Sequence, residues 1–414
     1  MTKQFDIPKP LVTQAYKLVK ANAGAAGVDQ QSLKDFEIHL EDNLYKIWNR
    51  MSSGCYFPPP VKAVAIPKKT GGERILGIPT VGDRIAQTVV RLCFEPCVEP
   101  VFLNDSYGYR PNKSAIDALE VTRKRCWSYD WVLEFDVKGL FDNIPHELLM
   151  KAVRKHTDCK WVILYIERWL KVPMICKDGK QVERTRGVPQ GGVISPVLSN
   201  LFMHYVFDLW MKRNYPENPW CRYCDDGLVH TKTEKEALDI LTALGDRFRE
   251  CGLELHPEKT RIVYCKDGNR RSPYSSKSFD FLGYTFRPRV CKTEKSNKLF
   301  VGFTPAVSKK SLKAMCRKVR KLNVRNRTDL ELNDIAKWFN PILRGWVNYY
   351  GAIRRSGMYP LWRHFNRTLV AWAMKKYKHF RKHKVRAAVF LGKIAKRQPK
   401  LFVHWSQGME GSFA

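Results

Sequence analysis

The chain has 414 residues, 44% of them hydrophobic, which is enough for one large core or several smaller ones and excludes a largely disordered protein. Its 73 Lys and Arg outnumber its 40 Asp and Glu, and the formal net charge of +33 predicts a polyanionic partner such as nucleic acid. The sequence has no run of about eighteen apolar residues, so we expect no membrane-spanning helix. Its twelve cysteines are scattered along the chain, so we expect no zinc site.

The first part of the chain is expected to be helical. Apolar residues at helical spacing predict one helix within 8–22 and another within 35–51, and we group residues 1–60 as an N-terminal helical extension. After a run of prolines, residues 61–66 and 74–78 have strand character on either side of a turn rich in Lys and Gly. This pattern predicts a basic β-hairpin.

The middle of the chain has the element order of a ferredoxin-like split βαβ unit. Residues 131–137 predict a buried strand that ends near Asp136, and residues 221–230 predict two short strands around an acidic turn. Thr233 and Glu236 could form the capping box of the helix that follows. In this order of elements, strand ends and hairpin turns meet at one edge of the sheet. We therefore expect Asp136 and the acidic turn to converge.

From about residue 305 onward, the apolar residues return to helical spacing. Residues 301–414 contain 26 Lys and Arg but 4 Asp and Glu, so about two thirds of the excess positive charge lies there. Such a block is typical of a nucleic-acid-binding region. We expect an all-α domain over residues 300–390 and a basic C-terminal tail over residues 391–414.

Three carboxylates are candidate metal ligands. Phosphoryl transfer to a hydroxyl commonly uses two divalent cations about 3.5–4 Å apart, and clustered carboxylates can hold them. Asp225 and Asp226 are adjacent in the acidic turn, where their repulsion is costly unless solvent or a cation relieves it. Asp136 could complete the site from another strand. Taken alone, an Asp-Asp pair before Gly227 would be ordinary turn chemistry.

Three ordered blocks resemble those of reverse transcriptases. Residues 223–226 (YCDD) are similar to the Tyr-x-Asp-Asp box, and residues 135–146 (FDVKGLFDNIPH) are similar to the first catalytic box. Residues 186–200 (RGVPQGGVISPVLSN) resemble the template- and nucleotide-binding block of group II intron-encoded enzymes. The resemblance implies an α+β right-hand polymerase, with fingers and a ferredoxin-like palm over residues 61–290 and the helical domain as its thumb.

The resemblance also implies a metal site. Asp136, Asp225 and Asp226 would be the catalytic residues and, with the main chain of Val137, would hold two Mg²⁺ ions, for which Mn²⁺ is an alternative. Cys224 departs from the alanine that is common at this position in group II enzymes. We expect a small buried side chain there that affects primer handling, and not a catalytic thiol.

The same resemblance places basic residues of the predicted hairpin at the triphosphate. Arg74 lies in the second strand, and Lys68 and Lys69 lie in the turn. A guanidinium fork is well shaped to bind phosphate oxygens, which makes Arg74 the firmer assignment.

Three further residues are implied nucleotide contacts. Phe141 would be the steric gate that leaves no room for a 2′ hydroxyl, although an aromatic residue is also common in a core. Gln190 would lie beside the incoming nucleotide. Lys259 would lie close to the leaving pyrophosphate, with a solvated surface lysine as the alternative.

Residues 339–350 (FNPILRGWVNYY) resemble the signature of the maturase domain, which follows the polymerase in group II intron proteins. Aromatic and basic residues alternate here, a mixture that suits phosphate contact and base stacking, although the aromatic residues could instead form a core. The candidate RNA-binding residues are Arg344, Trp346, Arg354, Arg355, Lys375 and Lys376.

Together these features predict an RNA-directed DNA polymerase that uses an RNA template, a DNA primer and deoxynucleoside triphosphates. The second expected function is that of a maturase bound to group II intron RNA, in a cytoplasmic bacterial ribonucleoprotein without membrane contact. Two alternatives stay open: a domesticated relative that acts in phage defence or DNA repair, and an RNA-binding splicing cofactor without polymerase activity. Because no metal-ligand spacing of an endonuclease module is found, cleavage of a DNA target strand is not expected.

Overall fold

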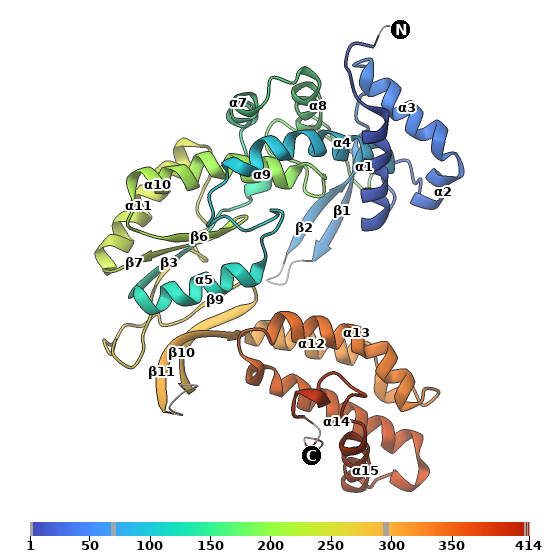
Figure 1. The fold of residues 1–414 in the computed structure, drawn as a ribbon, viewed down its shortest axis with the longest axis vertical. Coiled ribbons are helices and arrows are strands. Elements are labelled where there is room, and N and C mark those ends of the chain that lie inside the picture. The colour runs from blue at the N-terminus through green and yellow to red at the C-terminus, as the bar shows by residue number, and fades with distance from the viewer. Residues whose placement is uncertain (1–2, 68–71, 293–297, 410, 412, 414) are drawn as a thin grey trace. The chain divides into compact units, whose positions relative to one another are not determined.

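The computed structural model describes residues 3–67, 72–292, 298–409, 411 and 413. The chain forms two compact units (Figure 1). The first unit contains residues 1–114 and 133–262, and the second contains residues 115–132 and 263–414. In the described ranges, none of the helices has both the length and the apolar character that are needed to cross a membrane.

The first unit begins with helices, as the sequence predicts. They are α1 (Lys9–Asn22), α2 (Leu33–Ile38) and α3 (Leu40–Ser52). The helix expected within 35–51 is therefore two helices, separated at His39, whose φ of −123° and ψ of 49° are not helical. Helix α2 starts at a capping box in which Ser32 and Asp35 bond each other's main chain.

The predicted basic hairpin is confirmed. Strands β1 (Val61–Pro67) and β2 (Glu73–Ile78) pair antiparallel, with Ile66 opposite Arg74. Two short strands, β4 (Met174–Ile175) and β5 (Gln181–Val182), extend this sheet in the order β2-β1-β4-β5. The hairpin turn at residues 68–71 lies outside the described residues.

The predicted ferredoxin-like sheet is also confirmed. Its strands are β3 (Trp131–Asp136), β6 (Trp220–Tyr223), β7 (Asp226–Thr231) and β8 (Arg261–Tyr264). Their order β6-β7-β3-β8 places the second, third, first and fourth strands of the unit side by side, which is the ferredoxin-like arrangement. The helices between them include α7 (His146–His156) and α11 (Glu234–Glu250), and the Thr233 side chain accepts a bond from the main chain of Glu236 at the start of α11.

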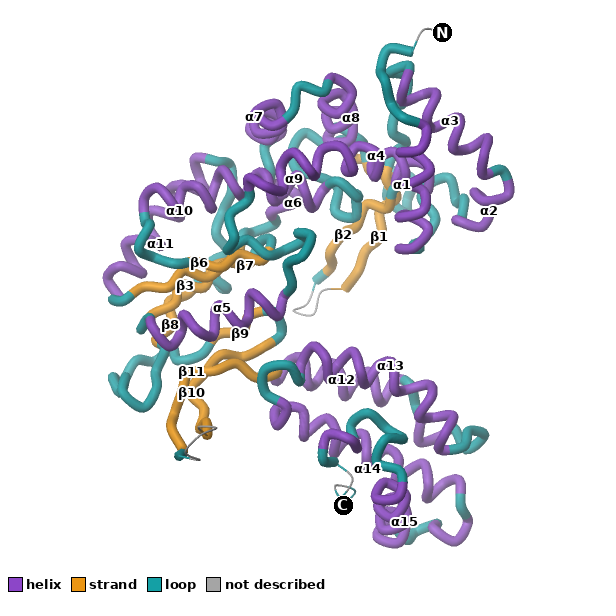
Figure 2. The backbone as a smooth tube through the Cα atoms, in the orientation of Figure 1, coloured by secondary structure: helices purple, strands orange, loops and turns teal. Residues whose placement is uncertain are grey.

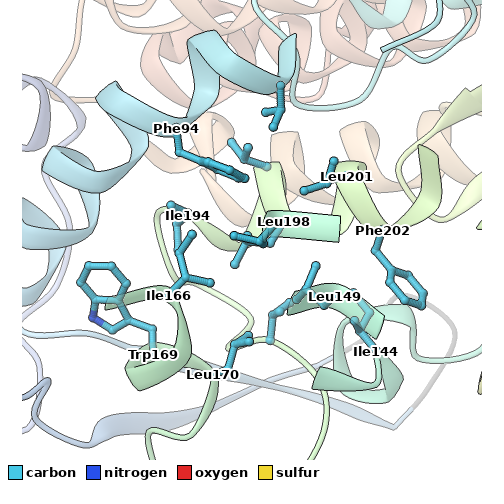
Figure 3. Packing of buried hydrophobic residues seen from close by; sticks show 14 of the residues in the cluster. Phe94, Ile144, Leu149, Ile166, Trp169, Leu170, Ile194, Leu198, Leu201 and Phe202 are labelled. Carbon is cyan, nitrogen blue, oxygen red and sulfur yellow. The ribbon is translucent and has the colours of Figure 1, made fainter. Parts of the chain in front are cut away.

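Further helices build the core of the first unit. They are α4 (Val81–Val98), α6 (Leu140–Asn143), α8 (Lys160–Leu170), α9 (Ser195–Met203) and α10 (Leu209–Asn214), with a 3₁₀ turn at Glu99–Val101 and a π-helix at His204–Asp208. Figure 3 shows Phe94, Ile166 and Leu198 packed together in this core. Burial of such apolar side chains is the main favourable term in folding, so this core supplies the rigid base for the sheet.

The second unit contains a sheet of three strands in the order β11-β10-β9. The strands are β9 (Phe279–Phe281), β10 (Tyr284–Lys292) and β11 (Leu299–Val307), and helix α5 (Ala115–Ser128) belongs to the same unit. Trp127 of α5 donates its indole N–H to the carbonyl of Phe303 at 2.9 Å. The sequence pattern does not predict the long β10–β11 hairpin.

Helices follow from residue 309, in agreement with the expected helical domain (Figure 2). They are α12 (Lys309–Lys321), α13 (Leu332–Tyr350), α14 (Tyr359–Lys376) and α15 (Lys384–Arg397), with 3₁₀ turns at Val324–Asn326, Arg355–Met358, Lys378–Phe380 and Trp405–Gln407. Helix α15 continues beyond residue 391, where we expected a tail to begin. Phe402 and Trp405 are fully buried in the same core, so we propose to count the C-terminal residues with the helical domain.

Candidate active site

Main-chain hydrogen bonds bring separate segments together at the end of strand β3. The N–H of Val137 donates to the carbonyl of Asp225 at 3.2 Å, and the N–H of His256 donates to the carbonyl of Asp136 at 2.8 Å. These bonds join the strand end to the β6–β7 turn on one side and to the segment after α11 on the other. Asp136 and Asp225 therefore lie at the same edge of the sheet, as the strand order predicts.

The β6–β7 turn depends on small residues. Cys224 has a φ of 63°, in the left-handed region, and the main chain of Gly108 passes so close that a Cβ there would lie 2.6 Å from the Cys224 nitrogen. A Cβ on Gly227 would lie 2.1 Å from the ring of Phe135. A side chain at Gly108 would therefore displace the main chain of the turn, and a side chain at Gly227 would displace the ring of Phe135.

A fully buried ion pair lies behind this turn. The Arg222 guanidinium donates to both carboxylate oxygens of Asp208 at 2.7 Å, and it also donates to the carbonyl of Cys224 at 3.2 Å and to the Ser106 hydroxyl at 2.9 Å. Asp208 is the last residue of the π-helix. Two-point contact between guanidinium and carboxylate fixes geometry, so Arg222 braces the turn from inside the core.

The carboxylates gather where negative charge is costly. Burial raises the pKa of Asp225, and the nearby charge of Asp136 raises it further. Burial also raises the pKa of Asp226, with added contributions from the charge of Asp225 and from a hydrogen bond with Asp136. Lys259 supplies a positive charge next to these carboxylates, because its ammonium nitrogen lies 2.9 Å from Oδ2 of Asp136.

A cavity of about 820 Å³ opens beside these carboxylates. Asp136, Asp225 and Lys259 line it together with the other described candidates for nucleotide contact, which are Arg74, Phe141 and Gln190. Phe141 is 7% exposed and lines the cavity, so it belongs both to the core and to the cavity wall. A place in the core is therefore compatible with the proposed role as a steric gate. Lys68 and Lys69 lie outside the described residues.

Comparison with known families decides the family of the chain. Residues 66–286, more than half of the chain, match the family model described as reverse transcriptase (RNA-dependent DNA polymerase). The chain belongs to the reverse transcriptase family. Residues 312–390 of this family member match the model described as the group II intron maturase-specific domain, which places the chain in the group II intron-encoded branch.

Its relatives include intron-encoded proteins. The chain is 32% identical over 259 residues to the group II intron-encoded protein LtrA of Lactococcus lactis, an alignment that covers 60% of this chain and 42% of LtrA. It is 30% identical over 315 residues to protein YkfC of Escherichia coli, with 66% of this chain and 79% of YkfC covered. This reverse transcriptase family member therefore spans less than half the length of LtrA.

Two telomerase structures align with this reverse transcriptase family member. The apo telomerase of Candida tropicalis has a TM-score of 0.43 and 16% identity, with 59% of each chain covered. The telomerase of Candida albicans, in complex with a fragment of telomeric RNA, has a TM-score of 0.46 and 14% identity, with 91% of this chain and 68% of that chain covered.

Polymerases of the reverse transcriptase family generally use a divalent metal ion. Within the described residues, no three His, Cys, Asp or Glu side chains are arranged to hold a metal ion as they stand. The donor set nevertheless fits such an ion, because carboxylate oxygens are the hard ligands that Mg²⁺ prefers. Burial is the main cause of the raised pKa of both Asp225 and Asp226, and the charge of neighbouring carboxylates, which a bound cation would offset, raises it further.

Several residues that line the cavity are not indicated by any sequence pattern. Glu73, Asp142, Arg184 and His256 line the cavity, and the side-chain amide of Gln190 donates to Oδ2 of Asp142 at 2.9 Å. Asp142 lies within the first catalytic box, yet only the fold shows that its side chain reaches Gln190. No spacing rule links these two positions.

Cys224 agrees with the expectation of a small buried side chain. It is 5% exposed, and burial raises the pKa of its thiol well above the usual value. A thiol that holds its proton so firmly is a poor nucleophile.

The candidate RNA-binding residues differ in their exposure to solvent and in their hydrogen bonds to the protein. Arg344, Arg355 and Lys375 are exposed, whereas Trp346 is half-buried. Arg354 donates to the carbonyl of Val290 at 3.0 Å, and Lys376 pairs with Glu331 at 2.6 Å. Trp362 and Trp372, two other aromatic residues of this domain, are buried in the helical core.

Proposed function

We propose that this protein is an RNA-directed DNA polymerase, which adds deoxynucleotides to the 3′ end of a DNA primer on an RNA template. One observation carries this proposal. Within a chain of the reverse transcriptase family, a buried strand end and a hairpin turn bring Asp136 and Asp225 to the edge of a cavity that Arg74 and Gln190 also line. Opposed acidic and basic groups of this kind suit a bound cation and a triphosphate, respectively.

The carboxylates are the proposed ligands of two Mg²⁺ ions, with Mn²⁺ as the alternative. Asp136, Asp225 and Asp226 would hold them beside the main chain of Val137. When bound, such ions activate the attacking hydroxyl and neutralise charge on the phosphates. The protein would hold these carboxylates in place at the ends of rigid strands. The main-chain hydrogen bond between Val137 and Asp225 supports this role, because it ties the two strand ends together.

The wall of the cavity supplies the proposed nucleotide contacts. Arg74 is the proposed triphosphate ligand, together with Lys68 and Lys69 from the hairpin turn. Phe141 would exclude a 2′ hydroxyl, a role that its place in the cavity wall and its burial in the core support. Lys259 lies beside Asp136 and would act on the leaving pyrophosphate.

Action as a maturase is the second proposed function. The match of residues 312–390 to the maturase-specific domain supports it, as does the concentration of positive charge over residues 301–414. Among the candidate residues, Arg344 and Arg355 are the exposed cations best placed to contact phosphate, and Trp346 is the candidate for base stacking. Arg354, Lys375 and Lys376 would contribute less, because their charged groups already bond the protein. The proposed partner is group II intron RNA, within a cytoplasmic ribonucleoprotein.

The polymerase proposal is tested by supplying an RNA template with an annealed DNA primer, the four deoxynucleoside triphosphates and Mg²⁺. We expect the primer to be extended to the end of the template, and we expect chelation of the metal to stop extension. Failure to extend in either Mg²⁺ or Mn²⁺ would favour a splicing cofactor. The maturase proposal is tested separately, by the rate of self-splicing of a group II intron RNA with and without the protein.

A further inference from the structure

The side-chain amide of Gln190 lies between a base and an acid. Arg74 donates from Nε to Oε1 of Gln190 at 2.5 Å, and Gln190 donates from Nε2 to Oδ2 of Asp142 at 2.9 Å. A guanidinium only donates and a carboxylate only accepts. The amide therefore has one orientation here, because a flipped amide would face oxygen with oxygen and nitrogen with nitrogen.

The main chain around Gln190 is held independently of Asp142. The N–H of Gly77 in strand β2 donates to the carbonyl of Gln190 at 2.7 Å, and the N–H of Val193 donates to the side chain of Gln87 at 2.7 Å. Gly191 has a φ of 112°, and a Cβ there would lie 2.7 Å from the carbonyl oxygen of Gly77. Loss of the Asp142 side chain should therefore free the Gln190 side chain and leave the loop in place.

The contact with Gln190 leaves the phosphate-binding end of Arg74 available. The Arg74 side chain is exposed, and among the described residues its one hydrogen bond is the bond from Nε to Gln190. The two Nη groups, which form the fork that suits phosphate oxygens, are not used in that bond. A free arginine loses considerable rotamer entropy when it binds a ligand, and an arginine that is already tethered loses less.

Asp142 itself is poorly suited to contact a triphosphate. It is exposed, and it directly follows Phe141 in the short helix α6, so its negative charge would repel phosphate unless it were balanced. Arg184 lines the same cavity, and the charge of Asp142 opposes the lowering of the Arg184 pKa by burial. This arrangement suits a residue that orients its neighbours and is itself balanced by a cation.

We propose that Asp142 is a positioning residue for the incoming deoxynucleoside triphosphate. Through the amide of Gln190, it holds Arg74 with its fork free for the triphosphate. The inference rests on the proposed polymerase function and adds to it a residue that does not touch the substrate.

The test is single-nucleotide incorporation on a saturating RNA template and DNA primer. We expect Asp142→Ala to raise the KM for the deoxynucleotide about tenfold and to change kcat by less than about twofold, because what is lost is one charge-assisted hydrogen bond that organises the ground state and the transition state alike. Asp142→Asn should recover most of the affinity, because its amide oxygen still accepts from Gln190. In a Gln190→Ala background, Asp142→Ala should add little, because the link between Asp142 and Arg74 is already broken.

Glu217→Ala, which removes an exposed carboxylate that does not line the cavity, is the matched control and should leave KM unchanged. An unchanged KM in Asp142→Ala, or full additivity with Gln190→Ala, would overturn the inference. If Asp142→Ala does not fold, Asp142→Ser takes its place, because serine is too short to reach Gln190. Absence of primer extension by the wild type would instead overturn the proposed polymerase function, so the two failures are distinguishable.

Discussion

Lys259 places its ammonium nitrogen 2.9 Å from Oδ2 of Asp136, the carboxylate at the end of strand β3. An ammonium group in this position neutralises a carboxylate that we propose as a metal ligand. A metal ion that binds Asp136 through this oxygen must first displace the ammonium group. In the absence of nucleotide, Lys259 and the metal ion should therefore compete for Asp136.

This competition predicts that Lys259→Ala binds divalent metal more tightly than the wild type. The Lys259 side chain is 49% exposed, so solvent weakens the ion pair, and we expect the dissociation constant for Mn²⁺ to fall by only about two- to fivefold. Electron paramagnetic resonance of free Mn²⁺ measures this constant without any catalysis. Lys138→Ala is the control, because Lys138 lines the same cavity but pairs with Glu254. Equal changes in the two variants would show that only overall charge matters.

Phe141→Ala is expected to admit ribonucleotides. Phe141 lines the cavity beside the carboxylates, and removal of its ring is expected to open space for a 2′ hydroxyl. Single-nucleotide incorporation should show a fall of about tenfold or more in the ratio of kcat/KM for deoxynucleotide over ribonucleotide. Phe207→Ala controls for lost packing, because Phe207 is fully buried and does not line the cavity. Unchanged sugar discrimination in Phe141→Ala would remove Phe141 from the site.

Asp208→Ala should destabilise the first unit strongly. Burial by itself would raise the pKa of Asp208, but the charge and hydrogen bonds of Arg222 outweigh it and lower that pKa. Removing the carboxylate leaves the fully buried Arg222 without its counter-ion, a change that costs about 3–5 kcal/mol in the free energy of unfolding. Denaturant unfolding measures this cost. Asp246→Ala, which removes an exposed partner of Arg249, should cost less than about 0.5 kcal/mol, and a similarly small cost for Asp208→Ala would refute the account of the brace.

Asp83 predicts a pH dependence of stability with a definite sign. It is fully buried and accepts from the Tyr56 hydroxyl at 2.9 Å and the Trp169 indole at 2.8 Å, and burial raises its pKa from 3.8 to about 6 in spite of these bonds. Between about pH 4 and pH 6 the folded state thus holds a proton that the unfolded chain has released. Stability should therefore fall as pH rises through this window, by up to about 3 kcal/mol.

Asp83→Asn tests this linkage, because asparagine does not titrate. The variant loses stability at pH 4, because its amide nitrogen cannot accept the hydrogen bond that the Gln87 side chain donates to Oδ2 of Asp83. The difference in unfolding free energy between wild type and variant should then shrink as pH rises to 7. A difference that stays constant across this range would show that Asp83 does not titrate with an altered pKa.

Much of the first unit could be predicted from sequence, because its local patterns agree with its tertiary contacts. The hairpin of β1 and β2 follows from two strand-like runs around a turn, and the position of Asp136 at the end of β3 follows from a buried apolar run. Convergence of Asp136 with Asp225 then follows from the ferredoxin-like order of strands. The break between α2 and α3 at His39 was missed, because apolar spacing continues through it.

The features that were missed depend on long-range pairing. The β10–β11 hairpin pairs residues up to 23 positions apart, such as Tyr284 with Val307. The contact between Asp142 and Gln190 joins residues 48 positions apart, and the pairing of Arg222 with Asp208 depends on a π-helix, for which the sequence has no clear signal. Such contacts arise from the fold and not from local propensity.

The most direct test of the polymerase account compares the wild type with Asp225→Asn in extension of a DNA primer on an RNA template. The substitution keeps the size of the side chain but removes the negative charge that a metal ion needs, and it changes none of the proposed RNA-binding residues. We predict that extension falls at least about a thousandfold while affinity for the template and primer stays within about twofold of wild type. Extension by Asp225→Asn at a rate near that of the wild type would contradict the account, because synthesis would then not depend on the carboxylates at the end of strand β3.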